Sequence, residues 1–459
     1  MLFSSYEFLF CFLPLVILIY FLLSRVGAVV QRTFLVVASL YFYAYNNPKY
    51  LLLILASILI NYLIAYVMQI GRKRIPQCAK IALCIGVIFN VVLIGYYKYY
   101  DFLIENINAL TGMQFLLKQI VLPLGISFFT FQQLSFLISV YKEEERVGNL
   151  LDYALFISFF PQLIAGPIVL YSEIIPQLKD SARRYFNADN FAIGLYVFSI
   201  GLFKKTVISD ALDGLVNSGY SADILHAAGA WVTTLCYTLQ IYFDFSGYSD
   251  MAVGLGKMFN IDIPENFRSP YKSASITEFW KRWHITLGRA LGSYIYIPLG
   301  GNRKGEPRTC VNLLLTFFVS GLWHGASWTF VLWGVLHGVL RVGERIFHNV
   351  LEKIPRLLRV AGTFLTVNFL WVLFRAESFT QAARMYKSMF DFSGSDAGFL
   401  TENHLLALAL LLVVFWLPNS GWLKERFKPN YLTVAAVVIA IVASVICVSR
   451  GSVFIYFNF

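Results

Sequence analysis

The sequence predicts an all-α polytopic membrane protein, and two observations support this prediction. The 459 residues are 58% hydrophobic and only 14% charged, whereas soluble domains are typically about 45–50% apolar and about 25% charged. Apolar runs recur along the whole chain, and a run of about 20 apolar residues is long enough to cross a bilayer as a helix. A soluble fold could not bury this much apolar surface.

The basic charge of the chain fits the same fold. Lys and Arg number 37 against 26 acidic residues, which gives a net charge of +11. Nucleic-acid-binding proteins are also basic, but here the basic residues lie between the apolar runs and form no single stripe. Cytoplasmic loops of membrane proteins have this distribution. We therefore expect the lipid bilayer as a partner and no nucleic acid.

The apolar runs give the candidate membrane spans in order. Several runs are short for a full crossing, so we expect about 11–12 transmembrane helices together with re-entrant or interfacial helices. The candidates cover residues 6–24, 33–46, 50–69, 80–97, 120–140, 151–171, 189–208, 229–246, 310–322, 328–343, 360–374, 404–417 and 431–449.

The placement of Lys and Arg predicts the orientation, because loops rich in these residues stay in the cytoplasm. The loop 71–80 has four basic residues, and the segments 344–359 and 418–430 are also basic, whereas 391–404 is not. We therefore expect both termini outside the cell and an even number of crossings. The segment 431–459 would comprise the last span together with an extracellular aromatic tail.

One helix start is visible in the polar stretch between Gln240 and Trp333. Ser275 stands three residues before Glu278, which is the spacing of a capping box. A continuous amphipathic helix beginning there would have Trp283 on its apolar face and His284 at the edge of that face. Such a helix suits a membrane interface or a cavity wall, and an ordinary interfacial helix would explain the pattern equally well.

A second histidine lies in a more apolar setting. His324 stands in "FVSGLWHGASWTF", and an ionisable residue within apolar sequence is a functional candidate because burying it is costly. Gly321 and Gly325 flank Trp323 and His324, which would allow another backbone or a substrate to approach closely. A histidine packed between helices is the alternative. His337 would lie on the opposite side of a continuous helix and would not pair with His324.

Acidic and hydroxyl side chains follow the apolar run at 229–246. The motif "YFDFSGYSDM" contains Asp244, Ser246, Ser249 and Asp250. Uncompensated carboxylates do not remain in lipid. We expect these residues to cap a broken helix or to line a wet cavity, with Arg268 as a possible partner.

Common catalytic and metal-binding signatures are absent from the sequence. It has no G-x-S-x-G, G-x-G-x-x-G or H-E-x-x-H motif, and its six cysteines form no C-x-x-C pair. No metal is expected. Residue patterns alone leave open an enzyme and a transporter that uses histidine as a proton relay. Transporters often have duplicated halves, and the lack of an evident repeat favours an enzyme.

Several motifs together resemble one membrane family. The segments "YFDFSGYSDM", "FWKRWHITLG", "GLWHGASWTF" and "FFPQLIAGPIVLYSEIIPQL" are similar to the membrane-bound O-acyltransferase (MBOAT) family. The similarity is strongest to its bacterial alginate O-acetyltransferase (AlgI-like) branch, which is related to DltB and PatA-type proteins. The resemblance implies a single membrane domain over 1–459 with its motif core at about 120–346. It also implies a funnel-like helical fold around a central tunnel.

The resemblance also implies an activity and its residues. The family transfers an acyl group from a thioester donor to a hydroxyl. Its invariant histidine corresponds to His324, an expected general base, and its second histidine corresponds to His284, an expected orienting or oxyanion-stabilising group. The residues further expected to bind substrate or to line the tunnel are Trp323, Trp283, Asp244 and Asn266.

The resemblance to the family also implies the acyl donor and the partner proteins. No cofactor is expected to be bound. The donor would be acetyl-CoA or an acyl carrier protein on the cytosolic side, and an extracellular SGNH-type partner would pass the acetyl group to polysaccharide or peptidoglycan. The segment 431–449 with "FIYFNF" resembles a small single-span protein of some DltB systems. This suggests an acyl relay on Tyr456, with a simple aromatic anchor as the alternative. D-alanyl transfer to teichoic acid and a non-enzymatic transporter remain alternative functions.

Overall fold

The computed structural model is helical and describes most of the chain. Among the described residues, extended pairing is confined to one isolated antiparallel bridge between Phe267 and Trp283. The described residues are 1–72, 75–396, 403–448 and 454–455. Contacts within the chain define two compact units, Met1–Ser199 with Met251–Pro264 and Ile200–Asp250 with Glu265–Phe459. We name them the N-terminal and C-terminal units. The expectation of a single domain over 1–459 stays a prediction.

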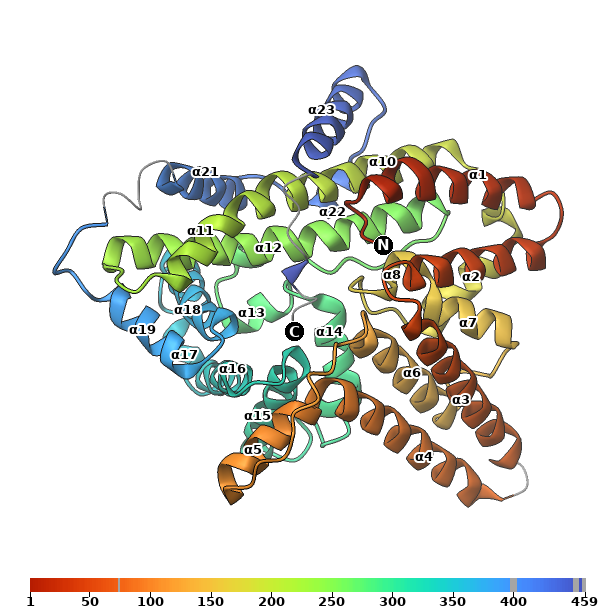
Figure 1. Cartoon of the computed structure of the whole chain (residues 1–459), viewed down its shortest axis with the longest axis horizontal. Coiled ribbons are helices and arrows are strands. Elements are labelled where there is room, and N and C mark those ends of the chain that lie inside the picture. The colour runs from red at the N-terminus through yellow and green to blue at the C-terminus, as the bar shows by residue number, and fades with distance from the viewer. Residues whose placement is uncertain (73–74, 397–402, 449–453, 456–459) are drawn as a thin grey trace. The chain divides into compact units, whose positions relative to one another are not determined.

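The N-terminal unit is built mainly from α-helices, and α3, α4 and α6 pack against one another (Figure 1). Its elements are η1 (Glu7–Phe12), α1 (Leu13–Leu23), α2 (Ala28–Ala44), α3 (Lys49–Arg72), α4 (Pro76–Ile94), η2 (Gly95–Tyr99), α5 (Tyr100–Thr111), α6 (Ile126–Tyr141), α7 (Leu150–Ser158), α8 (Phe160–Leu163), α9 (Tyr171–Lys179), η3 (Ser181–Arg183) and most of α10 (Ala188–Phe203).

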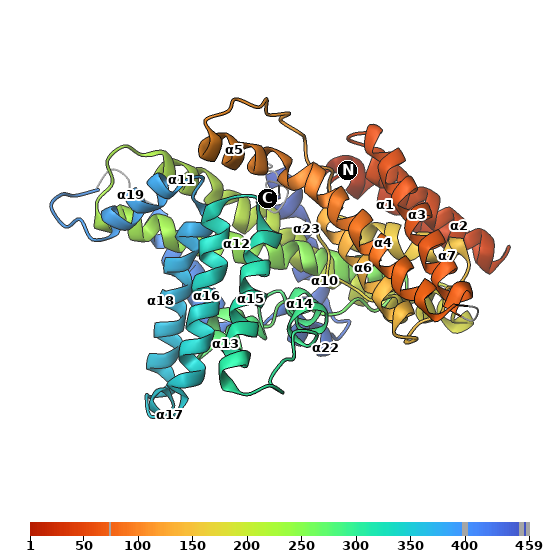
Figure 2. The same cartoon turned by 90° about the horizontal axis from the view of Figure 1, so that it is seen from below.

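In the C-terminal unit, α15, α16 and α18 run side by side (Figure 2). The elements of this unit are η4 (Lys204–Ser209), α11 (Asp210–Ser221), most of α12 (Ala227–Met258), η5 (Pro270–Lys272), α13 (Ile276–Trp280), α14 (Ile285–Leu291), η6 (Gly292–Tyr296), α15 (Glu306–His324), α16 (Trp328–Ile346), α17 (His348–Leu351), α18 (Arg356–Arg375), α19 (Phe379–Met389), α21 (Asn403–Trp416), α22 (Ser420–Glu425) and α23 (Tyr431–Cys447).

The prediction of an all-α multi-pass membrane protein is confirmed. Four helical stretches among the described residues are long and apolar enough to cross a membrane, namely Lys49–Arg72, Gln77–Thr111, Ala188–Ser221 and Arg356–Arg375. Shorter apolar helices are Glu7–Leu23, Ala28–Ala44, Ile126–Tyr141, Leu406–Trp416 and Tyr431–Cys447. The number of crossings and the orientation of the termini stay predictions.

Two predicted spans are wrong in extent, and glycine and proline explain both. The span expected at 151–171 breaks after Ser158, because Pro161 lacks an N–H and can stand only in the first turn of a new helix, α8. The span expected at 120–140 begins only at Ile126, because Gly125 has a left-handed φ of 69°. Both runs are therefore shorter as helices than their hydropathy predicts.

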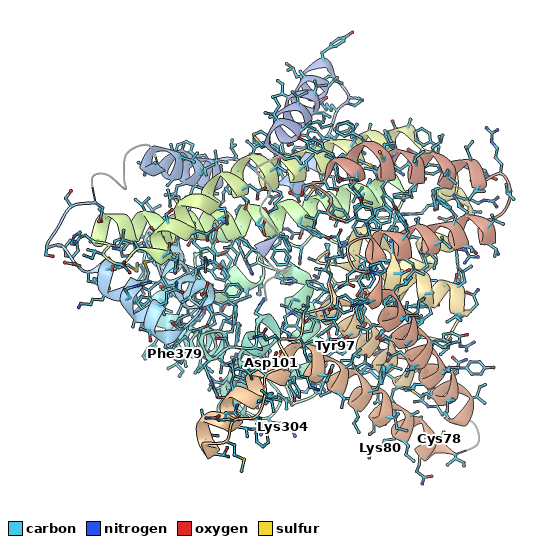
Figure 3. The ribbon with its side chains drawn as sticks, in the orientation of Figure 1. Cys78, Lys80, Tyr97, Asp101, Lys304 and Phe379 are labelled. Carbon is cyan, nitrogen blue, oxygen red and sulfur yellow. The ribbon has the colours of Figure 1, made fainter. Side chains whose placement is uncertain are left out.

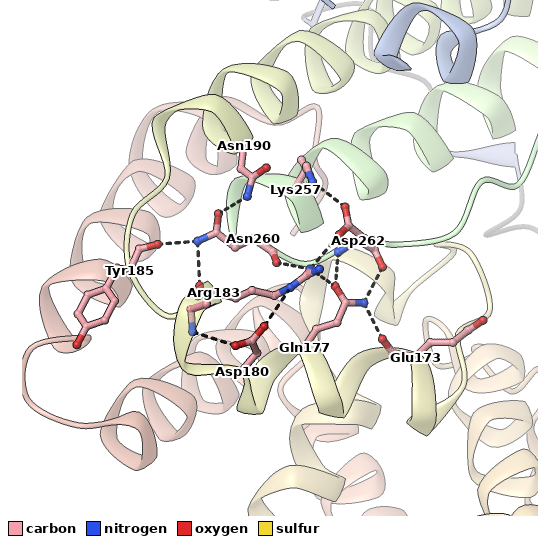
Figure 4. Close-up of polar contacts among 10 residues, drawn as sticks. Glu173, Gln177, Asp180, Arg183, Tyr185, Asn190, Lys257, Asn260 and Asp262 are labelled. Atoms are coloured by element: carbon pink, nitrogen blue, oxygen red, sulfur yellow. Dashed lines mark hydrogen bonds and ion pairs between the residues drawn. The ribbon is translucent and has the colours of Figure 1, made fainter. Parts of the chain in front are cut away.

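Polar side chains fix the non-helical segments of the N-terminal unit. Asp101, labelled in Figure 3, lies at the start of α5. Its carboxylate accepts hydrogen bonds from the backbone N–H groups of Lys118 (2.7 Å) and Ile120 (3.2 Å). In a second cluster, Arg183 donates to Asp262 at 2.9 Å, and Gln177 accepts from the Asp262 N–H at 2.8 Å (Figure 4). The bonds to the N–H groups of Lys118, Ile120 and Asp262 satisfy backbone donors of non-helical segments.

Glycines set the contact between α15 and α16. A Cβ added at Gly334 would lie 2.4 Å from the Phe317 carbonyl oxygen and 2.9 Å from the Gly321 Cα. A Cβ added at Gly321 would lie 2.4 Å from the Phe330 carbonyl oxygen. The two helices can pack this closely only because both positions lack a side chain.

We predict that Gly334→Ala destabilises the C-terminal unit, because the new methyl group meets rigid backbone. Overpacking of this kind typically costs about 1–3 kcal/mol. Gly343→Ala is a matched control in the same helix, since nothing lies within 4 Å of a Cβ there. Thermal unfolding in detergent should show a lower midpoint for Gly334→Ala alone, and equal midpoints for the two variants would contradict the contact.

Candidate active site

A short antiparallel pairing positions His284. The Arg268 N–H donates to the Arg282 carbonyl at 2.9 Å, and the Ile285 N–H donates to the Asn266 carbonyl at 3.0 Å. The continuous amphipathic helix predicted through this region is therefore wrong. This pairing takes the chain out of the helix after α13, and His284 has a left-handed φ of 47° before α14 begins. Helical periodicity could not reveal a break imposed by a partner segment.

The start of α13 is close to the predicted one. Ser275 caps the helix by accepting the Glu278 N–H at 3.0 Å, as the sequence predicts. The Glu278 carboxylate instead accepts the Ala274 N–H at 2.8 Å. Glu344 of α16 accepts the N–H of Thr277 at 2.9 Å and its hydroxyl at 2.6 Å. A carboxylate from α16 thus fixes α13 against that helix.

Asn266 fixes the orientation and tautomer of the His284 ring. The Asn266 Oδ1 atom accepts the Thr286 N–H at 3.1 Å and the Thr286 hydroxyl at 3.0 Å. His284 Nδ1 lies 3.2 Å from the same oxygen. Because this oxygen is an acceptor, the network assigns the proton of the neutral ring to Nδ1. Nε2 then carries a lone pair and can accept a hydrogen bond.

His284 lies in the turn between α13 and α14, outside the membrane-spanning helices, and is 1% exposed. Burial lowers the pKa of His284 to about 3, because the charged form loses its hydration. The imidazole is therefore neutral at pH 7. The edge of the Phe245 ring packs against it, with ring centroids 4.7 Å apart.

His324 ends α15 and is 2% exposed. Its ring lies 5.2 Å from Trp333 and 5.2 Å from Phe374, and 6.5 Å from the ring of His284, between centroids. The structure therefore brings the two predicted histidines together in a buried aromatic enclosure. Both come from helix ends, where the backbone leaves the helix and can direct a side chain inward.

His337 has a different setting from the one predicted. α15 ends at His324 and α16 begins at Trp328, close to the two separate spans expected at 310–322 and 328–343, so His337 does not share one continuous helix with His324. His337 accepts a hydrogen bond from Trp280 Nε1 at 3.3 Å and packs on Trp333. His337 thus contributes to the packing beside the site.

The structure separates the four lining candidates into different roles. Asn266 holds His284, as described above. Trp283 is buried and packs on Phe267 and Trp371, with centroids 5.0 Å away in each case, so it belongs to the aromatic core. Trp323 is half-buried on α15 beside His324.

Asp244 is fully buried within α12. The helix is continuous at this position, so the broken helix, one of the two settings predicted for Asp244, is wrong. Its carboxylate pairs with Lys205 at 2.8 Å and accepts the Ile455 N–H at 2.9 Å. The suggestion that Arg268 pairs with these acidic residues is wrong, because Arg268 pairs with Glu265 at 2.8 Å. Lys204 pairs with Asp250 at 2.6 Å. Two adjacent lysines in the apolar run 189–208 were the signal that could have revealed these pairs.

Tyr456 lies outside the described residues. The two residues before it, Phe454 and Ile455, are described and contact α12. The proposed role of Tyr456 therefore stays a prediction.

A large cavity lies next to the two histidines within the C-terminal unit. Its volume is about 1600 Å³, and it is lined by Ile285, the neighbour of His284, and by Ser320, one helical turn before His324. Charged side chains of both signs line it: the basic residues are Lys281, Arg289, Arg341, Arg345, His348 and Arg359, and the acidic residues are Glu306, Glu344 and Glu352. Three of the basic residues pair with these glutamates, namely Arg345 with Glu306, Arg341 with Glu344 and His348 with Glu352. Within the described ranges, no group of three or more His, Cys, Asp or Glu residues could hold a metal ion.

Comparison with known proteins identifies the family of the chain. The model of the membrane-bound O-acyltransferase family matches residues 108–380. The chain belongs to the membrane-bound O-acyltransferase family. The matched region contains His284, His324, Asn266, Asp244 and the residues that line the cavity.

Individual relatives refine the family assignment. A peptidoglycan O-acetyltransferase of Helicobacter pylori is 40% identical, over 100% of this chain and 98% of the relative. The probable alginate O-acetylase AlgI of Pseudomonas aeruginosa is 40% identical, over 91% of this chain and 81% of the relative. A teichoic acid D-alanyltransferase of Bacillus subtilis is 26% identical, over 56% and 69% respectively.

We predict that Asn266→Leu lowers the rate of acyl transfer by about 100-fold, because a reacting group displaced by about 1 Å can cost that much. Asn266→Asp keeps the oxygen that accepts from Thr286 and His284 and should retain more activity. Asn312→Leu is a control for the loss of a buried asparagine, since Asn312 donates to Gly301 away from the histidines. Equal activity in Asn266→Leu and Asn312→Leu would contradict the positioning role.

Proposed function

We propose that this MBOAT protein is an O-acetyltransferase that moves an acetyl group from a cytosolic thioester across the membrane for O-acetylation of an extracellular polysaccharide or peptidoglycan. The observation that carries the proposal is the pair of buried imidazoles, 6.5 Å apart between ring centroids, one of them fixed by Asn266. The relatives named peptidoglycan O-acetyltransferase and probable alginate O-acetylase support the choice of acyl group.

We assign His324 as the general base. A hydroxyl is a weak nucleophile at neutral pH, and an imidazole can take its proton during attack on the thioester carbonyl. The new acyl C–O bond forms as the C–S bond breaks. The proton held by His324 then passes to the leaving thiolate, so that the histidine is regenerated.

We assign His284 as an orienting group. A neutral ring with its proton on Nδ1 presents Nε2 as an acceptor, so it can hold a hydroxyl or an N–H in place. Stabilising an oxyanion requires a donor at that atom. The hydrogen bond to Asn266 and the low pKa of His284 therefore favour orientation over oxyanion stabilisation.

The cavity is lined by more basic than acidic side chains, which suits the thioester donor. Acetyl-CoA carries phosphates and acyl carrier proteins are acidic, and both would be attracted by its Lys and Arg side chains. The cavity is lined by part of the basic segment 344–359, which the charge distribution assigns to the cytoplasm. This supports donor entry from the cytosol in a bacterial plasma membrane, with both termini outside.

The acceptor in the first step is proposed to be the Tyr456 hydroxyl, from which an extracellular SGNH-type partner would take the acetyl group. The contacts of Phe454 and Ile455 with α12 support a tail held in the C-terminal unit with both histidines. A D-alanyl transferase for teichoic acid is the second candidate, favoured by the more distant D-alanyltransferase relative.

We predict that His324→Gln lowers acyl transfer by about 100- to 10,000-fold, the usual contribution of a general base. His337→Gln is the control, because it also replaces a buried histidine beside the site. Radiolabelled acetyl-CoA and a carrier protein charged with D-alanine should be tested as separate donors in purified membranes. Normal transfer by His324→Gln would exclude the mechanism, and transfer from the D-alanyl carrier alone would favour the second candidate.

We predict that Tyr456→Phe abolishes acetylation of the extracellular polymer, because it removes the single oxygen proposed to carry the acetyl group. Tyr431→Phe removes a hydroxyl from the exposed start of α23 and serves as a control. The measurement is the acetyl content of the isolated cell-wall polymer. Wild-type acetylation in Tyr456→Phe would mean that the tail is only an aromatic anchor.

A further inference from the structure

A buried charged cluster joins α12 to the aromatic tail. Lys205 of η4 pairs with Asp210 at 2.7 Å and with Asp244 at 2.8 Å, and the exposed fractions of these side chains are 5%, 2% and 0%. Two carboxylates therefore share one ammonium group. Removing charges from water is costly unless they are fully paired and hydrogen-bonded, so each oxygen of the buried Asp244 carboxylate needs a donor.

The aromatic tail supplies such a donor. The Ile455 backbone N–H donates to Asp244 Oδ2 at 2.9 Å, whereas Lys205 lies beside the other oxygen, Oδ1. A hydrogen bond to an ionised carboxylate is stronger than one between neutral groups. The bond uses the backbone, so it fixes the path of the chain at the residue immediately before Tyr456.

An aromatic contact fixes the neighbouring residue. Phe454 is 2% exposed and lies 4.7 Å from Tyr248 and 6.0 Å from Phe245, between ring centroids. Tyr248 and Phe245 are three residues apart on α12, so they lie on one face of the helix. Phe245 also packs on His284. The same aromatic residue thus contacts both the tail and an imidazole of the site.

The preceding helix leads the chain to this position. α23 packs against η4, the element that contains Lys205. The last helix and the two described tail residues therefore contact neighbouring parts of one surface. This surface consists of η4 and the Asp244–Tyr248 turn of α12.

We propose that Asp244, charged and held by Lys205, is a docking clamp for the aromatic tail and acts as a positioning residue for acyl transfer. Its occupant is the segment Phe454–Ile455 of the same chain. The clamp holds the Ile455 backbone and the Phe245–Tyr248 face holds the Phe454 side chain, so both described tail residues are fixed on α12. The positioning role rests on the proposed function, whereas docking itself does not.

Hydrogen exchange of the Ile455 amide in the full chain in detergent tests the clamp independently of activity. Asp244→Leu should speed this exchange by about 10- to 100-fold, the range for loss of a hydrogen bond to a charged group. Asp244→Asn keeps an acceptor oxygen and should give an intermediate rate. Asp250→Asn is the matched control. Asp250 lies on α12 like Asp244, but it pairs with Lys204 and Ser420 and not with the tail.

Acyl transfer to polymer, measured on the same variants, tests positioning. Transfer should be lowest in Asp244→Leu, where Ile455 exchange is expected to be fastest, and intermediate in Asp244→Asn. Asp250→Asn should be close to wild type in both measurements. Unchanged exchange in Asp244→Leu would overturn the clamp, and faster exchange with normal transfer would overturn the positioning role. If the wild type transfers no acyl group, the proposed function and the positioning role both fail, while the exchange rates still decide whether Asp244 docks the tail.

Discussion

Polar atoms buried among apolar helices must find partners inside the protein, because lipid offers none. This constraint organises the C-terminal unit. The Asn266 side-chain oxygen accepts from Thr286 and from His284, and the Asp244 carboxylate accepts from Lys205 and the Ile455 N–H. Each buried polar group therefore fixes a segment that comes from elsewhere in the sequence. The hydrogen bonds and ion pairs that compensate for the burial of these polar groups also hold the site in place.

The same constraint suits the proposed chemistry. A base that must act on a hydroxyl works best when its orientation and protonation are set before the substrate arrives. The rings of Trp333 and Phe374 pack against His324, the proposed base, and Asn266 sets the orientation and tautomer of His284 beside it. The cavity beside them offers basic side chains to an anionic donor.

Local sequence patterns predicted the features that depend on local chemistry. Hydropathy predicted the all-α membrane fold, and His324 was recognised because a histidine in apolar sequence is costly. The break before His284 and the Asp244–Lys205 pair escaped prediction, since both depend on residues distant in sequence. The cavity also escaped, because its walls come from α13 to α18. Glycine and proline shortened two spans that hydropathy alone overestimated.

The most direct test of the proposed relay is to find the acyl group in transit. Purified full-length protein would be given radiolabelled acetyl-CoA without any extracellular partner, digested, and its peptides analysed by mass spectrometry. We predict a base-labile acetyl ester on the peptide that contains Tyr456. A label found only on other residues, with none on that tyrosine, would contradict the relay.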